Sequence, residues 1–100
     1  MTRTIAGFDW DHGNWPKCGK HGVGKAEIEG LFQAAPMVLK DRYPEEVESR
    51  FNAVGRTQAG RHLFVVFTLR EKDGNTLIRP LSARRMHRKE IEKYERTRQG

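Results

Sequence analysis

The sequence predicts a single α+β domain, with N-terminal helices and a C-terminal helix packed on an antiparallel β-sheet meander. Apolar residues recur with helical spacing at Ile28, Leu31 and Phe32, which is typical of an amphipathic helix. Residues 50–84 instead contain three strand-like runs separated by turn signals, which is typical of antiparallel hairpins. A chain of 100 residues has room for one hydrophobic core, so we expect residues 1–100 to form one domain.

The first third of the chain is expected to contain a short strand and two helical segments. Residues 5–10 are predicted to form the strand, and residues 11–18 an irregular or single-turn helix with Trp15 as its apolar anchor. The spacing of apolar residues predicts a longer helix over residues 23–34. Pro36 ends that helix, because proline disfavours helical backbone in the residue before it.

The remaining residues predict a sheet followed by a last helix. A strand begins at residues 37–39 and fades into a polar loop. Further strands are expected at residues 50–56, 62–70 and 77–84, with turns at 57–60 and 73–74 between them and a helix over 86–99 after them. The continuous apolar run at 62–70 predicts a central strand covered on both faces. Pro80 lacks an amide hydrogen, so the last strand is expected to lie at an edge or to carry a bulge there.

The charge of the chain favours a polyanionic partner. Lys and Arg number 19 against 13 Asp and Glu, which leaves a net charge of +6. A surplus of this kind suits nucleic acid, through phosphate contacts and the release of counterions. A basic surface that is merely solvated explains the composition equally well. A membrane surface fits less well, because the basic residues do not accompany an exposed apolar helical face.

The cysteine content and the absence of apolar segments favour a cytoplasmic protein. Cys18 is the single cysteine, so no intramolecular disulfide can form, and a reducing compartment fits best. No run approaches the roughly 20 apolar residues that span a bilayer, and the first residues lack the pattern of a secretory signal. No zinc site or other metal site is expected, because Cys18 has no cysteine partner at tetrahedral spacing.

Simple hairpin registers gather basic residues from separate segments at one end of the sheet. With a tight first turn, Arg56 faces Arg61. With the second turn centred on residues 73–74, Leu63 faces Arg84. The expected phosphate-binding cluster consists of Arg56, Arg61, His62, Arg84, Arg85, His87 and Arg88. Arginine suits this role because its planar guanidinium binds phosphate in a bidentate manner.

Arg70 and the candidate proton carriers lie outside this cluster or at its margin. Arg70 pairs near Leu77, roughly 23 Å along the strand, so it can contact the same RNA strand but not the same phosphate. His21 can act as an acid or a base at neutral pH, although a helix cap explains it equally well. Glu90 and Tyr94 could also transfer protons, but a helix ion pair and a docking aromatic are the more ordinary roles for them.

Motifs along nearly the whole chain, about residues 8–95, resemble one known family. They are Trp10-Asp11, Lys17, Lys20-His21-Gly22-Val23, Arg50-Phe51, Gly55, Gly60-Arg61, Val66-Phe67-Thr68, Arg70, Ile78-Arg79, Ser82-Ala83-Arg84, Glu90 and Tyr94. In order and spacing this set resembles the BrnT family of toxins from bacterial type II toxin–antitoxin pairs. The chain departs from the family pattern at Asn14-Trp15-Pro16 and at Pro80.

The resemblance implies a RelE-like fold and a metal-independent endoribonuclease, without cofactors, that halts translation and growth. It also implies neutralisation by a cognate BrnA-like antitoxin in a heterotetramer, and binding of the operator DNA of the operon only through that complex. The functional arginines of the family fall on Arg70, Arg84 and Arg85 here, and His21 is a further transferred position.

These considerations give one mechanistic hypothesis and two alternatives. Arg84 and Arg85 clamp the scissile phosphate, Arg70 guides the RNA strand, and His21 or Glu90 handles protons. The residues expected to bind RNA around this site are Arg56, Arg61, His62, Arg88 and Lys20. The alternatives are a non-catalytic module that binds nucleic acid or protein, and a degenerate toxin that serves as a co-repressor subunit of its operon complex.

Overall fold

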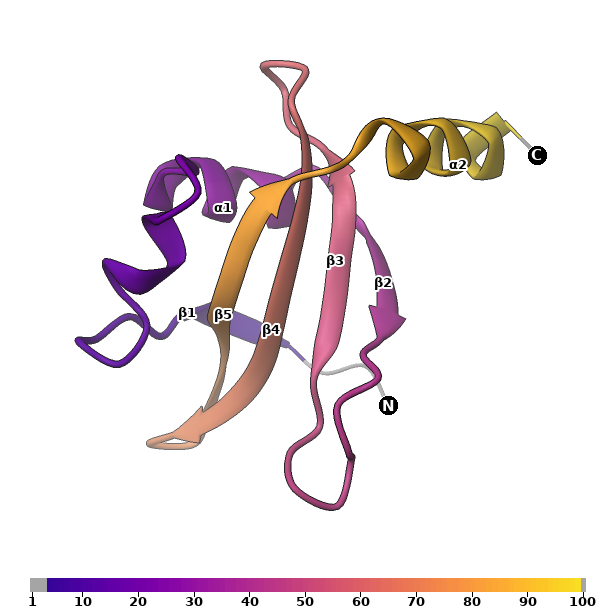
Figure 1. Cartoon of the computed structure of the whole chain (residues 1–100). Coiled ribbons are helices and arrows are strands. Elements are labelled where there is room, and N and C mark those ends of the chain that lie inside the picture. The colour runs from indigo at the N-terminus through magenta and orange to yellow at the C-terminus, as the bar shows by residue number, and fades with distance from the viewer. Residues whose placement is uncertain (1–3, 100) are drawn as a thin grey trace.

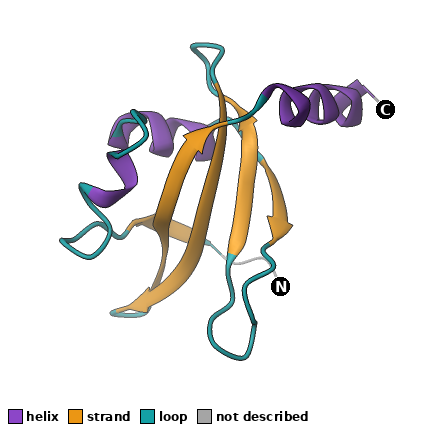
Figure 2. Cartoon of the chain, in the orientation of Figure 1, coloured by secondary structure: helices purple, strands orange, loops and turns teal. Residues whose placement is uncertain are grey.

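Helices and one five-stranded sheet make up the chain, as the α+β prediction requires (Figures 1 and 2). The computed structural model describes residues 4–99. The elements are β1 (Ile5–Phe8), the 3-10 helix η1 (Lys17–Gly19), α1 (Lys25–Gln33), β2 (Met37–Lys40), β3 (Phe51–Arg56), β4 (His62–Lys72), β5 (Asn75–Arg85) and α2 (Arg88–Gln99). Every predicted strand is present, and the two N-terminal helical segments are η1 and α1. Neither α-helix of the described chain is long and apolar enough to cross a membrane.

The sheet is mixed rather than wholly antiparallel, which corrects the prediction. Its strand order is β1-β5-β4-β3-β2. Strands β2 to β5 form the predicted antiparallel meander, whereas β1 pairs in parallel with β5, with Phe8 opposite Ile78. The edges are therefore β1 and β2, and β5 lies inside the sheet (Figure 1). Of the two alternatives predicted for the strand containing Pro80, an edge position or a bulge, the edge position is therefore excluded.

The β3–β4 hairpin has a register that differs by one residue from the prediction. Arg56 pairs with His62 rather than with Arg61. The amide of Thr57 donates to the carbonyl of Arg61 at 2.9 Å, and Gly60 adopts a φ of 89°. A turn that ends in a left-handed glycine adds one residue to the loop as a bulge. Because neighbouring residues alternate sides along a strand, His62 points to the same side as Arg56 and Arg61 does not.

The β4–β5 hairpin begins in the predicted register and then shifts. Arg70 pairs with Leu77, as predicted. Beyond that rung, Leu81 is an extra residue in β5, which is a β-bulge. Leu63 consequently faces Arg85, one residue later than predicted. The bulge expected near Pro80 is thus present, and it accounts for the shift.

The bulge decides which residues of β5 reach the hydrophobic core. Before it, Ile78 points to the same side as Leu69, its partner in β4. After it, Ala83 points to that side, opposite Val65. Both Ile78 and Ala83 are buried, although an unbroken alternation would place an even and an odd residue on opposite sides. Arg84 therefore points away from the core.

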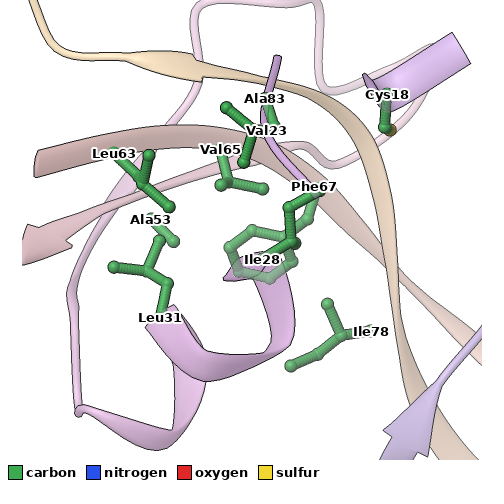
Figure 3. Packing of buried hydrophobic residues seen from close by; sticks show 10 residues of the cluster. All are labelled: Cys18, Val23, Ile28, Leu31, Ala53, Leu63, Val65, Phe67, Ile78 and Ala83. Carbon is green, nitrogen blue, oxygen red and sulfur yellow. The ribbon is translucent and has the colours of Figure 1, made fainter. Parts of the chain in front are cut away.

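The core lies between α1 and one face of the sheet, which we call the inner face. Ile28 and Leu31 of α1 are fully buried against this face, where Leu63, Val65 and Phe67 of β4 point toward them (Figure 3). Helix α1 forms over these residues because Ile28 and Leu31 recur at the spacing of one helical turn. The same alternation fixes the identity of the inner face along β3 and β5.

The opposite side of the sheet, the outer face, is only partly covered. Phe64 and Val66 of β4 point to it and are half-buried, so the prediction of a strand covered on both faces is wrong. Helix α2 lies over one end of this face and leaves a cavity of about 210 Å³ against it. Farther along β4 on this face, Thr68 is 4% exposed and donates to the carbonyl of Ser49 at 2.7 Å, whereas Arg70 is exposed.

A buried asparagine fixes the loop between β1 and η1. Asn14 is 1% exposed. Its Nδ2 donates to the carbonyls of Asp9 and Pro80, each at 2.9 Å, and its Oδ1 accepts from the amide of Asp11 at 2.9 Å. Arg79 adds ion pairs to Asp9 and Asp11, and its guanidinium holds the pKa of Asp11 below the ordinary value. The segment before η1 is thereby tied to β5.

Replacing Asn14 by alanine should lower the free energy of unfolding by about 2–3 kcal/mol, because it leaves buried carbonyls without a donor. Chemical denaturation measures the change. The control is Gln58→Ala, which removes an exposed amide in the β3–β4 turn and should cost less than about 0.5 kcal/mol. Equal stability of the two variants would contradict this role of Asn14.

Candidate active site

The predicted basic cluster lies at one end of the sheet, but the sheet divides it between two faces. Arg56, His62 and Arg84 point to the outer face, as their positions in the two ladders require. Arg61 and Arg85 point to the inner-face side. Consecutive strand residues point in opposite directions, so Arg84 and Arg85 do not share one phosphate pocket. The outer-face group is therefore the stronger candidate site.

Arg84 is held on the outer face by a bidentate ion pair. Its Nη1 and Nη2 donate to the two carboxylate oxygens of Glu90 at 2.8 and 2.9 Å, and its guanidinium lies 4.4 Å from the centre of the Phe64 ring. The bonds from Arg84 lower the pKa of Glu90 from its ordinary 4.5 to about 2, and they raise the pKa of Arg84. A carboxylate this acidic is a weak base, which argues against Glu90 as the proton acceptor.

Glu90 also fixes the start of helix α2. The backbone amide of His87 donates to Glu90 Oε1 at 2.7 Å, which satisfies one of the amides left without a partner at a helix N-terminus. The same oxygen accepts from Arg84. One side chain thus joins the first turn of α2 to β5 and sets where the helix leaves the sheet.

A histidine–glutamate pair forms the second contact between α2 and the outer face. His62 Nε2 lies 2.7 Å from Glu95 Oε2, and Tyr94 packs edge-on against the imidazole at 5.9 Å between ring centres. The hydrogen bond from His62 lowers the pKa of Glu95, with Arg98 adding to it through an ion pair at 3.3 Å. The sequence argument placed His62 among RNA-binding residues and missed its partner. Gly60 was the residue in the sequence that could have indicated this pairing. A bulge at a left-handed glycine shifts the register by one residue and so places His62 on the face that contacts α2.

The remaining predicted residues lie elsewhere. Arg61 Nε is 2.8 Å from Glu27 Oε2, an ion pair without the angle of a hydrogen bond. Arg85 is exposed and has no acidic partner within the described chain. Lys20 and His21 are exposed in the turn after η1, on the layer that covers the inner face, and the described residues offer them no side-chain partner.

Two further arginines are distant from the outer-face group or only loosely fixed. Arg70 lies at the other end of the outer face, six rungs of the ladder from Arg84, and is 3.4 Å from Glu48. Arg88 has a side chain that is 92% exposed and lies 3.8 Å from Glu92. The structure therefore groups Arg56, His62 and Arg84, and leaves the other predicted residues outside that group.

Comparison with known proteins identifies the class of activity. A family model described as a ribonuclease toxin, BrnT, of a type II toxin–antitoxin system matches residues 10–90. The chain belongs to the BrnT family. It is thus a ribonuclease toxin of a type II system and has an antitoxin partner. No curated protein gives a significant match to the chain.

The BrnT match contains most but not all of the outer-face group. Arg56, His62, Arg84 and Glu90 lie inside the matched range, whereas Glu95 lies beyond it. Within residues 4–99, no three or more His, Cys, Asp and Glu side chains gather in a way that could hold a metal ion. The outer-face group and its partners on α2 supply guanidinium, imidazole and carboxylate side chains.

The Arg84–Glu90 pair should make stability depend on pH in an acidic window. Because the folded-state pKa of Glu90 is lowered, its contribution is complete above its ordinary 4.5 and is lost as the pH falls toward about 2. Denaturation of the native chain and of Glu90→Gln at several pH values measures this. The difference between their free energies of unfolding should shrink between pH 4.5 and 2. A difference that stays constant over that window contradicts the pairing.

Proposed function

We propose that this chain is a metal-independent endoribonuclease that cuts RNA across the outer face of its sheet, with a RelE-like arrangement of sheet and helices. The BrnT match supports ribonuclease activity. The observation that supports the choice of face is the grouping of Arg84 with Arg56 and His62 on one face of the sheet, beside helix α2. It combines cations that can hold a phosphate with a group that can exchange protons near neutral pH.

Arg84 is proposed to bind the scissile phosphate. Its guanidinium is backed by the Phe64 ring, which orients it, and its Nε takes no part in the bonds to Glu90. A phosphate can therefore bind to Nε, or replace Glu90 on the two terminal nitrogens. In either case the fixed guanidinium lies next to the oxygens of the pentacoordinate phosphorus, where negative charge develops in the transition state. A cation already in place for that charge is the most effective form of electrostatic stabilisation.

The other predicted arginines are proposed to hold the RNA strand on both sides of that phosphate. Arg56 is exposed beside His62, and Arg70 lies roughly 20 Å along the outer face, so the two bracket the path of the strand. Arg61, Arg85, Arg88, Lys20 and His21 are proposed to contact flanking phosphates at the rim of the sheet end. None of these contacts reads the base sequence.

We also propose how the ribonuclease acts in the cell. Cleavage of RNA in the cytoplasm inhibits translation and growth, and a BrnA-like antitoxin neutralises the toxin in a heterotetramer that binds operator DNA. The net charge of +6 supports RNA as substrate, since an acidic surface would repel it.

One observation favours the alternative of a non-catalytic binding module or co-repressor subunit. Glu90 neutralises Arg84 in the absence of RNA, as expected of an arginine that only docks a helix. Catalysis and docking make different demands on Arg84, because only catalysis requires the guanidinium to act on the transition state.

Replacing Arg84 by alanine should lower the rate of RNA cleavage by about 10²–10³-fold, as for other transition-state donors. Arg84→Lys should lose somewhat less, since it keeps the charge without the planar fork. Cleavage of an RNA oligonucleotide in excess chelator measures both, and Arg42→Ala, an exposed arginine in the loop after β2, is the matched control.

Full activity of folded Arg84→Ala would contradict the assignment of Arg84. A native chain that binds RNA with steep salt dependence but leaves it intact would contradict catalysis altogether and support the binding module. Activity that disappears in chelator and returns with a divalent cation would contradict metal independence.

A further inference from the structure

We propose that His62 is the catalytic base of the ribonuclease and that Glu95 is its positioning residue. This inference rests on the proposed function, and it names the proton carrier that the arginines cannot supply. Arginine remains protonated in proteins, so it stabilises charge but does not accept the proton of a 2′-hydroxyl.

The contact with Glu95 fixes which ring nitrogen of His62 can act. Glu95 is ionised near neutral pH, because the hydrogen bond from His62 lowers its pKa, and an ionised carboxylate can only accept. The hydrogen of the neutral imidazole therefore lies on Nε2, which is 2.7 Å from Glu95 Oε2. The lone pair is then on Nδ1, the nitrogen that faces away from the carboxylate. The same division of labour between carboxylate and imidazole operates in hydrolytic triads.

His62 is held in place yet remains accessible. Its side chain is 16% exposed, and Tyr94 packs against the ring edge-on, so the imidazole is restrained from two sides. The imidazole thus has a fixed orientation and a partly exposed surface, and geometry is the first requirement for a general base.

The neighbours of His62 are the groups that would hold its substrate. Arg56 is directly opposite on β3, and Arg84 is opposite Phe64, the next outer-face residue of β4. From α2, Tyr94 and Glu95 contact the ring, and Arg98 pairs with Glu95. Outer-face residues two apart on a strand are separated by roughly 7 Å, so a phosphate on Arg84 places its ribose near His62.

The proposed step is transesterification within the RNA. His62 Nδ1 takes the proton of the 2′-hydroxyl, the 2′-oxygen forms a bond to phosphorus, and the bond from phosphorus to the 5′-oxygen breaks. The leaving oxygen takes a proton from water, and the imidazolium returns its own proton to the hydroxide. The products are an end with a 2′,3′-cyclic phosphate and an end with a 5′-hydroxyl.

The other titratable candidates fit this role less well. Glu90 is engaged by Arg84 and too acidic. His87 has a side chain that is 76% exposed, and its Nδ1 is 3.7 Å from Glu90, beyond hydrogen-bond distance. His21 is exposed in the turn after η1, and the described residues offer it no side-chain partner. Within residues 4–99, only His62 combines a hydrogen bond to a carboxylate with a place beside Arg84 on the outer face.

The test compares His62→Ala, His62→Asn and Glu95→Gln with the native chain, using kcat and KM on an RNA oligonucleotide. The two His62 variants should lose about 10²–10⁴-fold in kcat, and imidazole in the buffer should partly restore His62→Ala. Glu95→Gln should keep measurable activity, with its loss in kcat and little change in KM, because the imidazole is still present but is no longer oriented by a carboxylate. His12→Gln, an exposed histidine in the loop after β1, is the matched control.

Each outcome decides something. Full activity in either folded His62 variant overturns the inference, and a loss in Arg84→Ala within the same experiment shows that the proposed function survives. A Glu95→Gln variant that keeps the native kcat, or that loses activity only through KM, overturns the positioning role. Product ends with a 3′-hydroxyl and a 5′-phosphate overturn the base assignment. A native chain that cuts no RNA overturns both proposals.

Discussion

The arrangement of this chain depends on the bulge that Leu81 introduces into β5. One extra residue lets Ile78 and Ala83 both enter the core, although their numbers differ in parity. The same residue sends Arg84 to the outer face. Without the bulge, apolar residues of β5 could point into the core either before Leu81 or after it, but not in both segments. Arg84 would then point to the inner face and Arg85 to the outer face. The position of the candidate phosphate ligand is thus a consequence of core packing.

The sequence predicted the elements well because their signals are local. Apolar spacing located α1, and the glycine turns located both hairpins. The sequence did not predict two register shifts of one residue, at Gly60 and at Leu81. Each shift depends on a turn or bulge geometry that several sequences can adopt. Because strand neighbours alternate sides, these small offsets changed which basic residues meet. The pairing of His62 with Glu95 was missed for the same reason, and so was the parallel strand β1, whose partner is distant in sequence.

The outer face is electrostatically balanced rather than uniformly basic. Arg84 and His62 each face a carboxylate from α2, and these two contacts together with Tyr94 dock a helix that is otherwise mostly polar. The docking of α2 and the chemistry of the proposed site therefore use the same side chains. A phosphate that replaced Glu90 on the terminal nitrogens of Arg84 would release one of the contacts that hold α2, so in that binding mode substrate and helix position are physically coupled.

The central claim is that RNA lies on the outer face, and chemical-shift mapping tests it most directly. The protein, labelled at backbone amides and at arginine and histidine side chains, would be titrated with RNA that carries 2′-O-methyl groups and therefore cannot be cut. The largest shifts are expected at Arg56, His62 and Arg84. Shifts confined to Lys20, His21 and Arg85, with the outer face unaffected, would contradict it.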